Sequence, residues 1–81
     1  MLTAYELKNT IMNGLTCDHV EVLGEDGQHF EAVIVSPQFT GKNRVQQHQL
    51  VYLTLGERMR AEIHALSMRT FTPEGWEKST L

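Results

Sequence analysis

Five side chains of the sequence belong to the residue types that most often bind metal ions. They are four histidines and one cysteine: His19, His29, His48, His64 and Cys17. Imidazole is the commonest metal ligand in proteins, and thiolates bind zinc, copper and iron–sulfur clusters. Histidine is also common at buried and boundary positions. The predicted fold must therefore decide which of these side chains can meet at a metal.

A second candidate for chemistry is the segment FTGKNR, residues 39–44, which contains Lys42, Asn43 and Arg44. Cationic side chains beside a helix N-terminus can hold a phosphate group, because the first backbone N–H groups of the helix have no partner within it. A solvated loop that only caps the following helix explains the same residues and is the simpler interpretation.

The sequence has no arrangement typical of catalysis. It lacks paired carboxylates at a useful spacing, a Ser/His/Asp order with a supporting context, and a glycine-rich phosphate loop. We therefore expect a protein that binds partners or ligands and is not an enzyme.

Composition and charge narrow the classes of function. The 81 residues are expected to form one domain over 1–81, with 41% hydrophobic and 21% charged residues. The formal net charge of −3, from 7 basic and 10 acidic residues, opposes tight binding to the phosphates of a nucleic acid. We expect weak DNA binding at most.

The same counts give an expectation for the compartment. The single cysteine excludes an internal disulfide, and a small chain without disulfides fits a reducing environment. The start MLTAYELKNT lacks the features of a signal peptide, and no window approaches the roughly 20 apolar residues of a membrane helix. We expect a soluble cytoplasmic protein without membrane association, which is a monomer or weak homodimer when alone.

The first part of the chain predicts a helix followed by a hairpin. Thr3 and Glu6 form a capping-box pattern, and apolar residues then recur at helical spacing over about 3–14. Residues 19–35 alternate as strands do on both sides of the turn GEDG. The run 29–35 is apolar on both faces, which favours a central strand.

A long helix is predicted next. Asn43 and Gln46 resemble another capping box, and the apolar stripe that follows predicts a helix over about 43–59. Gly56 lies inside this helix and should cost roughly 1 kcal/mol relative to alanine.

The C-terminal part predicts a strand and a short helix. Residues 63–71 alternate in the manner of a strand. Thr72 is a cap and Pro73 suits the first helical position. We expect Trp76 to lay its ring against the sheet or the first helix.

The element order α-β-β-α-β-α defines an α+β fold. The short turn makes the first two strands antiparallel, and the helical crossover makes the second and third strands parallel. We predict a three-stranded mixed sheet with the 29–35 strand in the middle and helices packed on one face.

This topology brings two of the histidines together. If the strands 29–35 and 63–71 are adjacent and parallel, His29 and His64 both stand at or near strand starts at the same edge. Their rings can therefore come close. The alternative for His29 is a ring that only flanks Phe30 at a solvated turn.

The three remaining candidates are predicted to be structural. Cys17 precedes the first strand and lies roughly 20 Å from the hairpin turn at about 3.3 Å per residue, so we expect it to pack between helix and strand. His48 lies on the apolar stripe of the long helix and is expected to be a satisfied core or boundary residue. His19 begins the first strand at the end far from the turn.

Two stretches resemble the BolA family: HFEAVIVSPQFTGKNRVQQHQLVY (29–52) and LGERMRAEIHALSMRTFTPEGW (55–76). The His-Ala-Leu that follows the long helix and the closing Thr-Pro-x-x-Trp are the most specific parts. The likeness covers about residues 19–76. The short loop GEDGQHF resembles the small bacterial branch of the family, the YrbA or IbaG type.

The resemblance implies a fold similar to the type II KH domain and a role in iron–sulfur trafficking, iron regulation or stress response. BolA-like proteins pair with monothiol glutaredoxins and share a bridging [2Fe-2S] cluster, with glutathione supplied by the glutaredoxin. No cofactor is then expected in the isolated chain. The family's cluster-binding histidine in the Ile-His-Ala-Leu stretch matches His64.

The resemblance does not supply the second ligand. The family usually has a histidine or cysteine in the loop between the first two strands, and the loop LGEDG here has neither. His29 is the best substitute on the geometry of the predicted sheet. The predicted metal site is therefore His64 with His29.

Some BolA-like proteins are described as DNA-binding regulators, which gives the alternative function. KH domains clamp nucleic acid with a GXXG loop, but Gly41 is followed here by Lys42, Asn43 and Arg44 without the second glycine. The alternative is a transcriptional regulator that binds nucleic acid through this KH-like or helix-turn-helix-like surface. The negative net charge favours the cluster adaptor.

Overall fold

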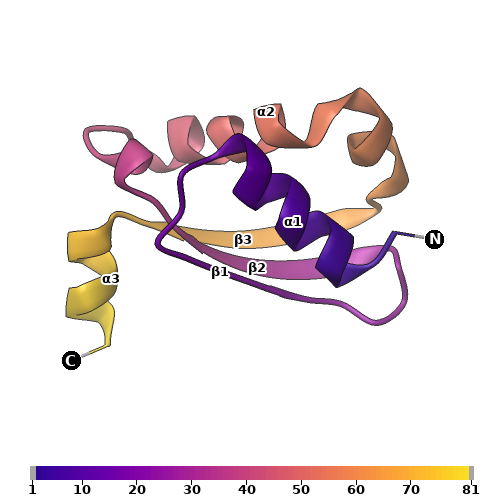
Figure 1. The fold of residues 1–81 in the computed structure, drawn as a ribbon, viewed down its shortest axis with the longest axis horizontal. Coiled ribbons are helices and arrows are strands. Elements are labelled where there is room, and N and C mark those ends of the chain that lie inside the picture. The colour runs from indigo at the N-terminus through magenta and orange to yellow at the C-terminus, as the bar shows by residue number, and fades with distance from the viewer. Residues whose placement is uncertain (1, 81) are drawn as a thin grey trace.

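The order of helices and strands confirms the predicted α+β fold and adds one short 3₁₀ helix, η1. The computed structural model describes residues 2–80 (Figure 1). The elements are α1 (Ala4–Gly14), β1 (His19–Leu23), β2 (His29–Val35), η1 (Pro37–Phe39), α2 (Arg44–Glu62), β3 (Ala65–Phe71) and α3 (Pro73–Ser79).

The sheet has the predicted order, with β2 in the middle. β1 pairs with β2 in the antiparallel sense, and β2 pairs with β3 in the parallel sense. The register sets His29 opposite Ala65 at one end and Val35 opposite Phe71 at the other. Figure 1 shows α1 and α2 together on one face of the sheet. Because β2 and β3 both begin at the same end of the sheet, the residues at their starts lie next to each other.

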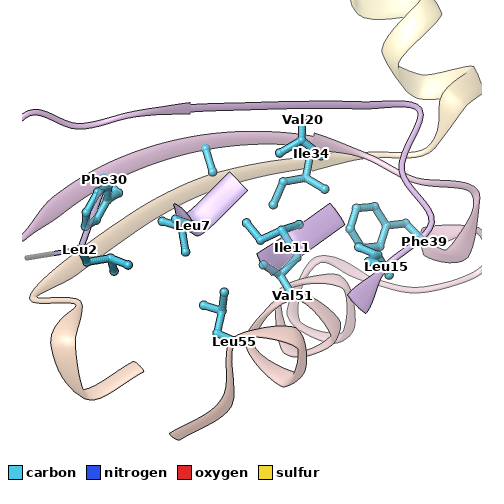
Figure 2. Packing of buried hydrophobic residues seen from close by; sticks show 11 residues of the cluster. Leu2, Leu7, Ile11, Leu15, Val20, Phe30, Ile34, Phe39, Val51 and Leu55 are labelled. Carbon is cyan, nitrogen blue, oxygen red and sulfur yellow. The ribbon is translucent and has the colours of Figure 1, made fainter. Parts of the chain in front are cut away.

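The hydrophobic core fills the space between this sheet face and the two long helices. Figure 2 shows the side chains that α1 and α2 direct toward the central strand. Burying one such side chain stabilises the fold by about 1.5–3 kcal/mol. The residues of α1, β2 and α2 that belong to this core cluster, each with at most 5% of its surface exposed, are Leu7, Ile11, Phe30, Ala32, Ile34, Val51 and Leu55.

The predicted helix starts are confirmed by their hydrogen bonds. The Thr3 hydroxyl accepts the N–H of Glu6. Asn43 and Gln46 form a complete capping box, in which each side chain accepts the other's backbone N–H. These caps satisfy N–H groups that have no partner inside a helix, and each is worth about 1 kcal/mol.

The long helix is not continuous, and this part of the prediction was wrong. Gly56 has φ 73° and ψ 166°, and the helix resumes beyond it to Glu62. This backbone region is open almost only to glycine, so the glycine breaks the helix instead of merely weakening it. Beyond the break, Met59 and Ile63 pack against the core. Since Ile63 caps α2, β3 begins at Ala65 and not at 63.

The short helix α3 places Trp76 on the sheet, as predicted. The Trp76 ring stacks on His19 at 5.3 Å between centroids and tilts against Phe71 at 5.2 Å. The alternation of β1 and β3 puts these two partners on the face opposite α1 and α2. The two long helices therefore share one face, and Trp76 covers one end of the other face.

None of the helices within residues 2–80 has the length and apolar character needed to cross a bilayer.

Candidate metal centre

His29 and His64 lie side by side at the end of the sheet where β2 and β3 begin. His29 is opposite Ala65 in the parallel register, so His64 is one residue ahead of its strand. The centroids of the two rings are 5.0 Å apart, and the ring planes meet at 71°. The proximity expected from the parallel topology is confirmed.

The backbone fixes His64 at this edge. The carbonyl of Gln28 accepts the N–H of His64 and the N–H of Ala65, each at 3.0 Å. Ile63, just before it, closes the last turn of α2 through its N–H to the carbonyl of Met59. The side chain of His64 is nevertheless exposed. Its ring therefore stands on an anchored backbone and remains open to another molecule.

His29 is held by Asp26, which lies in the turn between β1 and β2. The Asp26 Oδ1 accepts the backbone N–H groups of Gln28 and His29, both at 2.8 Å. The Asp26 Oδ2 lies 2.6 Å from Nδ1 of the His29 ring. Gly27 completes the turn with φ 75°, a conformation that favours glycine. Asp26 thus contacts both the backbone and the ring of His29.

These hydrogen bonds lower the pKa of the Asp26 carboxyl well below its usual range. The largest contribution is the backbone N–H of His29, followed by that of Gln28 and then by the His29 ring. The carboxylate therefore stays ionised and is a hydrogen-bond acceptor only. Sequence reasoning missed Asp26 because it treated GEDG only as a turn. The Asp-Gly pair, which favours side-chain to backbone bonds two residues on, was the available signal.

Two imidazoles at this spacing could hold one metal ion, but only as part of its coordination. Two imidazoles on one tetrahedral ion, with metal–nitrogen bonds of about 2.0–2.1 Å, have ring centres roughly 5 Å apart. The observed separation of His29 and His64 is of this size. Within residues 2–80, no group of three or more His, Cys, Asp or Glu side chains is arranged to hold an ion. A metal bound at this pair would need further ligands from another molecule.

Each histidine of the pair lines an open hollow of the surface. His64 lines one of about 590 Å³ together with Tyr52 and Arg60, whose guanidinium lies 5.5 Å from the centre of the Tyr52 ring. His29 lines the other, of about 350 Å³, together with Leu23. This end of the molecule therefore offers concave surface beside each of the two rings.

Cys17 is not part of this cluster. It is half-buried and packs against the hydrophobic core, as predicted. Burial raises the pKa of its thiol, and the neighbouring Asp18 raises it further. Its Sγ lies 3.3 Å from the carbonyl of Leu15. A thiol held neutral in this way is a poor metal ligand and a poor nucleophile.

His48 and His19 also lie away from the pair. His48 is half-buried on α2, as predicted, but it is not satisfied: among the residues described, its buried Nε2 has no hydrogen-bond partner. Burial lowers the pKa of His48, and Arg44 lowers it further. His19 stacks on Trp76, and its Nε2 lies 3.7 Å from the carboxylate of Glu21.

The segment predicted for nucleic-acid binding lies at the start of α2. Asn43 uses its side chain as the cap of the helix, so its oxygen faces the N–H of Gln46. Lys42 and Arg44 are exposed. Arg44 and Arg69 line a further hollow of about 420 Å³ beside β3. The two arginines could attract an anion, although part of the helix N-terminus is already occupied by its cap.

Comparisons with known proteins agree with this architecture. The chain is 38% identical to the "Acid stress protein IbaG" of Escherichia coli over 90% of this chain and 87% of that protein. It is 47% identical to the "DNA-binding transcriptional regulator BolA" of Haemophilus influenzae, over 60% of this chain and 48% of that protein.

A solved structure supports the same assignment. The structure of a BolA protein homologue from Coxiella burnetii superposes with a TM-score of 0.77 at 41% identity, and it covers 95% of this chain and 99% of that chain. Residues 9–75 match the family described as BolA-like protein. With its mixed sheet, its helix order and these relatives, the chain belongs to the BolA-like family.

Proposed function

We propose that this protein is an adaptor that pairs with a monothiol glutaredoxin and shares a [2Fe-2S] cluster with it. The observation that carries the proposal is the exposed pair of rings, His29 and His64. Their centroids lie 5.0 Å apart at the end of the sheet where β2 and β3 begin. A rigid edge presets the direction of both rings, as a binding site requires. The cluster is cargo, which the adaptor receives and passes on.

The chemistry of the two donors suits a carrier. Histidine ligands in place of two cysteines raise the reduction potential of a [2Fe-2S] cluster. The remaining ligands would come from the thiolate of the glutaredoxin and from glutathione. The adaptor contributes the two imidazoles, and the hollows beside His64 and His29 give a partner concave surface to contact.

The cellular role that follows is cluster trafficking, iron regulation or stress response. The name of the Escherichia coli relative, "Acid stress protein IbaG", supports the last of these. The match extends over 90% of this chain and 87% of that relative.

Anaerobic co-purification tests the proposal. The chain and a monothiol glutaredoxin are expressed together, purified through a tag on this chain, and examined by visible absorption and circular dichroism. We expect a coloured heterodimer whose dichroism differs from that of the glutaredoxin homodimer. Recovery of this chain alone, with the cluster remaining on the glutaredoxin homodimer, would contradict the proposal.

A nucleic-acid-binding regulator is the second candidate. It is supported by the relative named as a DNA-binding transcriptional regulator and by the hollow that Arg44 and Arg69 line. The net charge of −3 and the cap that occupies the start of α2 make this surface a weaker candidate than the histidine pair.

A further inference from the structure

The turn that holds His29 does more than reverse the chain. Asp26 divides its two carboxylate oxygens between two tasks. Its Oδ1 accepts the backbone N–H groups of Gln28 and His29, and its Oδ2 lies 2.6 Å from Nδ1 of the His29 ring. The first task shapes the turn, and the second acts on the ring alone.

We infer that Asp26 is a positioning residue that holds His29 with its proton on Nδ1 and so presents Nε2, beside His64, to the iron of a shared cluster. The inference rests on the proposed function for the identity of the metal. The tautomer itself is a property of the free chain.

The role of Asp26 depends on which ring nitrogen of His29 carries the proton. A carboxylate accepts hydrogen bonds and donates none, so the group facing it must be Nδ1–H. In a neutral ring the lone pair is then on Nε2. Carboxylate–histidine–metal arrangements use the same division, since the outer carboxylate fixes both the tautomer and the ring direction. Both oxygens of Asp26 face hydrogen-bond donors in this arrangement: the two backbone N–H groups on Oδ1 and the ring nitrogen on Oδ2.

The substitution Asp26→Asn separates the two tasks. The amide oxygen of asparagine can still accept both backbone N–H groups, so the turn is retained. The amide nitrogen replaces Oδ2 and donates to Nδ1, which moves the ring proton to Nε2. An aspartate-to-asparagine change acts in this way in serine proteases, where it leaves the geometry intact and gives the wrong histidine tautomer. The metal-facing nitrogen of His29 is then blocked.

Glu25→Gln is the matched control. Glu25 precedes Asp26 in the same turn, is exposed, and makes no hydrogen bond or ion pair with any residue from 2 to 80. The control removes one negative charge from the turn, as Asp26→Asn does. An effect that comes only from the lost negative charge, or from poor expression of a protein altered in this turn, would therefore appear in both Glu25→Gln and Asp26→Asn.

The first measurement is made on the free chain without metal. Long-range ¹H–¹⁵N spectra at about pH 8, above the ordinary histidine pKa of ~6.5, report the tautomer of each ring. The His29 signals are assigned by their loss in His29→Gln. We expect Nδ1–H for wild type and for Glu25→Gln, and Nε2–H for Asp26→Asn. An unchanged tautomer in Asp26→Asn would overturn the inference, whether or not a cluster can be shared.

The second measurement uses the complex with a cluster-loaded monothiol glutaredoxin. Loss of an outer-shell partner weakens metal binding by roughly 10- to 100-fold. We expect Asp26→Asn to lose the shared cluster to a chelator at least tenfold faster than wild type, and Glu25→Gln to match wild type. A switched tautomer with unchanged cluster loss would overturn the inference. So would a changed cluster spectrum in Asp26→Asn but not in His29→Ala, because Asp26 would then be a direct ligand.

Failure of the proposed function looks different from failure of the inference. If wild type shares no cluster with the glutaredoxin, the adaptor function is contradicted, and the tautomer measurement alone decides the role of Asp26. If wild type shares the cluster and the two variants behave alike, the function stands and Asp26 has no positioning role.

Discussion

At the scale of single residues, His64 and His29 are close because parallel strands begin at one edge. The sequence was sufficient to predict this, since a crossover helix between two strands makes them parallel and aligns their starts. Asp26 could not be predicted in the same way. Its contact with the His29 ring depends on the conformation of the Asp26–Gly27 turn and on a side-chain rotamer, and neither leaves a periodic trace in the sequence.

The half-buried histidine His48 predicts a pH dependence of stability. Its pKa is lowered in the folded state by burial and by Arg44, so below about pH 6.5 the unfolded chain binds the proton more readily than the folded chain. Stability should therefore fall as the pH drops through the unfolded pKa toward the folded one, and should recover as the pH rises.

The substitution His48→Met tests this. It removes the titrating group and also the buried Nε2 that lacks a partner among the described residues. We expect urea unfolding of the variant to change less between about pH 7.5 and about pH 5.5, roughly one unit on each side of the ordinary histidine pKa, than that of wild type. His64→Ala is the control, because that ring is exposed. Equal pH slopes for His48→Met and wild type would show that His48 does not couple to folding.

At the scale of elements, periodicity and caps predicted every strand and α-helix, but neither the short helix η1 nor the shape of α2. The stripe of apolar residues continues across Gly56 without interruption, so it gave no sign that the backbone leaves the helical region there. A glycine inside a helical pattern is compatible with both a straight and a broken helix, and packing makes the choice. Here Met59 and Ile63 reach the core beyond the break. The one-sided packing of α1 and α2 was predictable, whereas the contact of Trp76 with His19 on the other face was not.

Gly56→Ala should be destabilising because of its backbone angles. A Cβ built at Gly56 meets no atom within 4 Å, so crowding is not the cause. The backbone region near φ 73° and ψ 166° costs a non-glycine residue on the order of 1–3 kcal/mol. We expect a loss of this size in urea unfolding. Glu57→Ala, an exposed neighbour, should change stability by less than about 0.5 kcal/mol. A stability equal to wild type in Gly56→Ala would mean that the break in α2 is not required.

At the scale of the whole molecule, charge separates the two candidate functions. The protein has a net charge of −3, so the basic side chains around the Arg44 hollow form only a local positive patch on an acidic protein. We expect DNA binding to be weak and to weaken further with added salt, because it would rest on phosphate contacts alone. Fluorescence anisotropy with a labelled duplex at physiological salt measures this. Sequence-selective binding in the range of specific DNA-binding proteins, about 10⁻⁸ to 10⁻¹¹ M, would contradict the expectation and favour the regulator.

The measurement that tests the adaptor most directly compares three variants in the cluster-bridged complex with a monothiol glutaredoxin. The variants are His64→Ala, His29→Ala and Cys17→Ser, and the readouts are visible circular dichroism and the rate of cluster loss. The fold should tolerate all three, because both rings are exposed and the change at Cys17 is small. We expect His64→Ala to alter the spectrum and speed cluster loss, His29→Ala to do the same more weakly, and Cys17→Ser to match wild type. A cluster abolished by Cys17→Ser and left unaltered by His64→Ala would contradict the account.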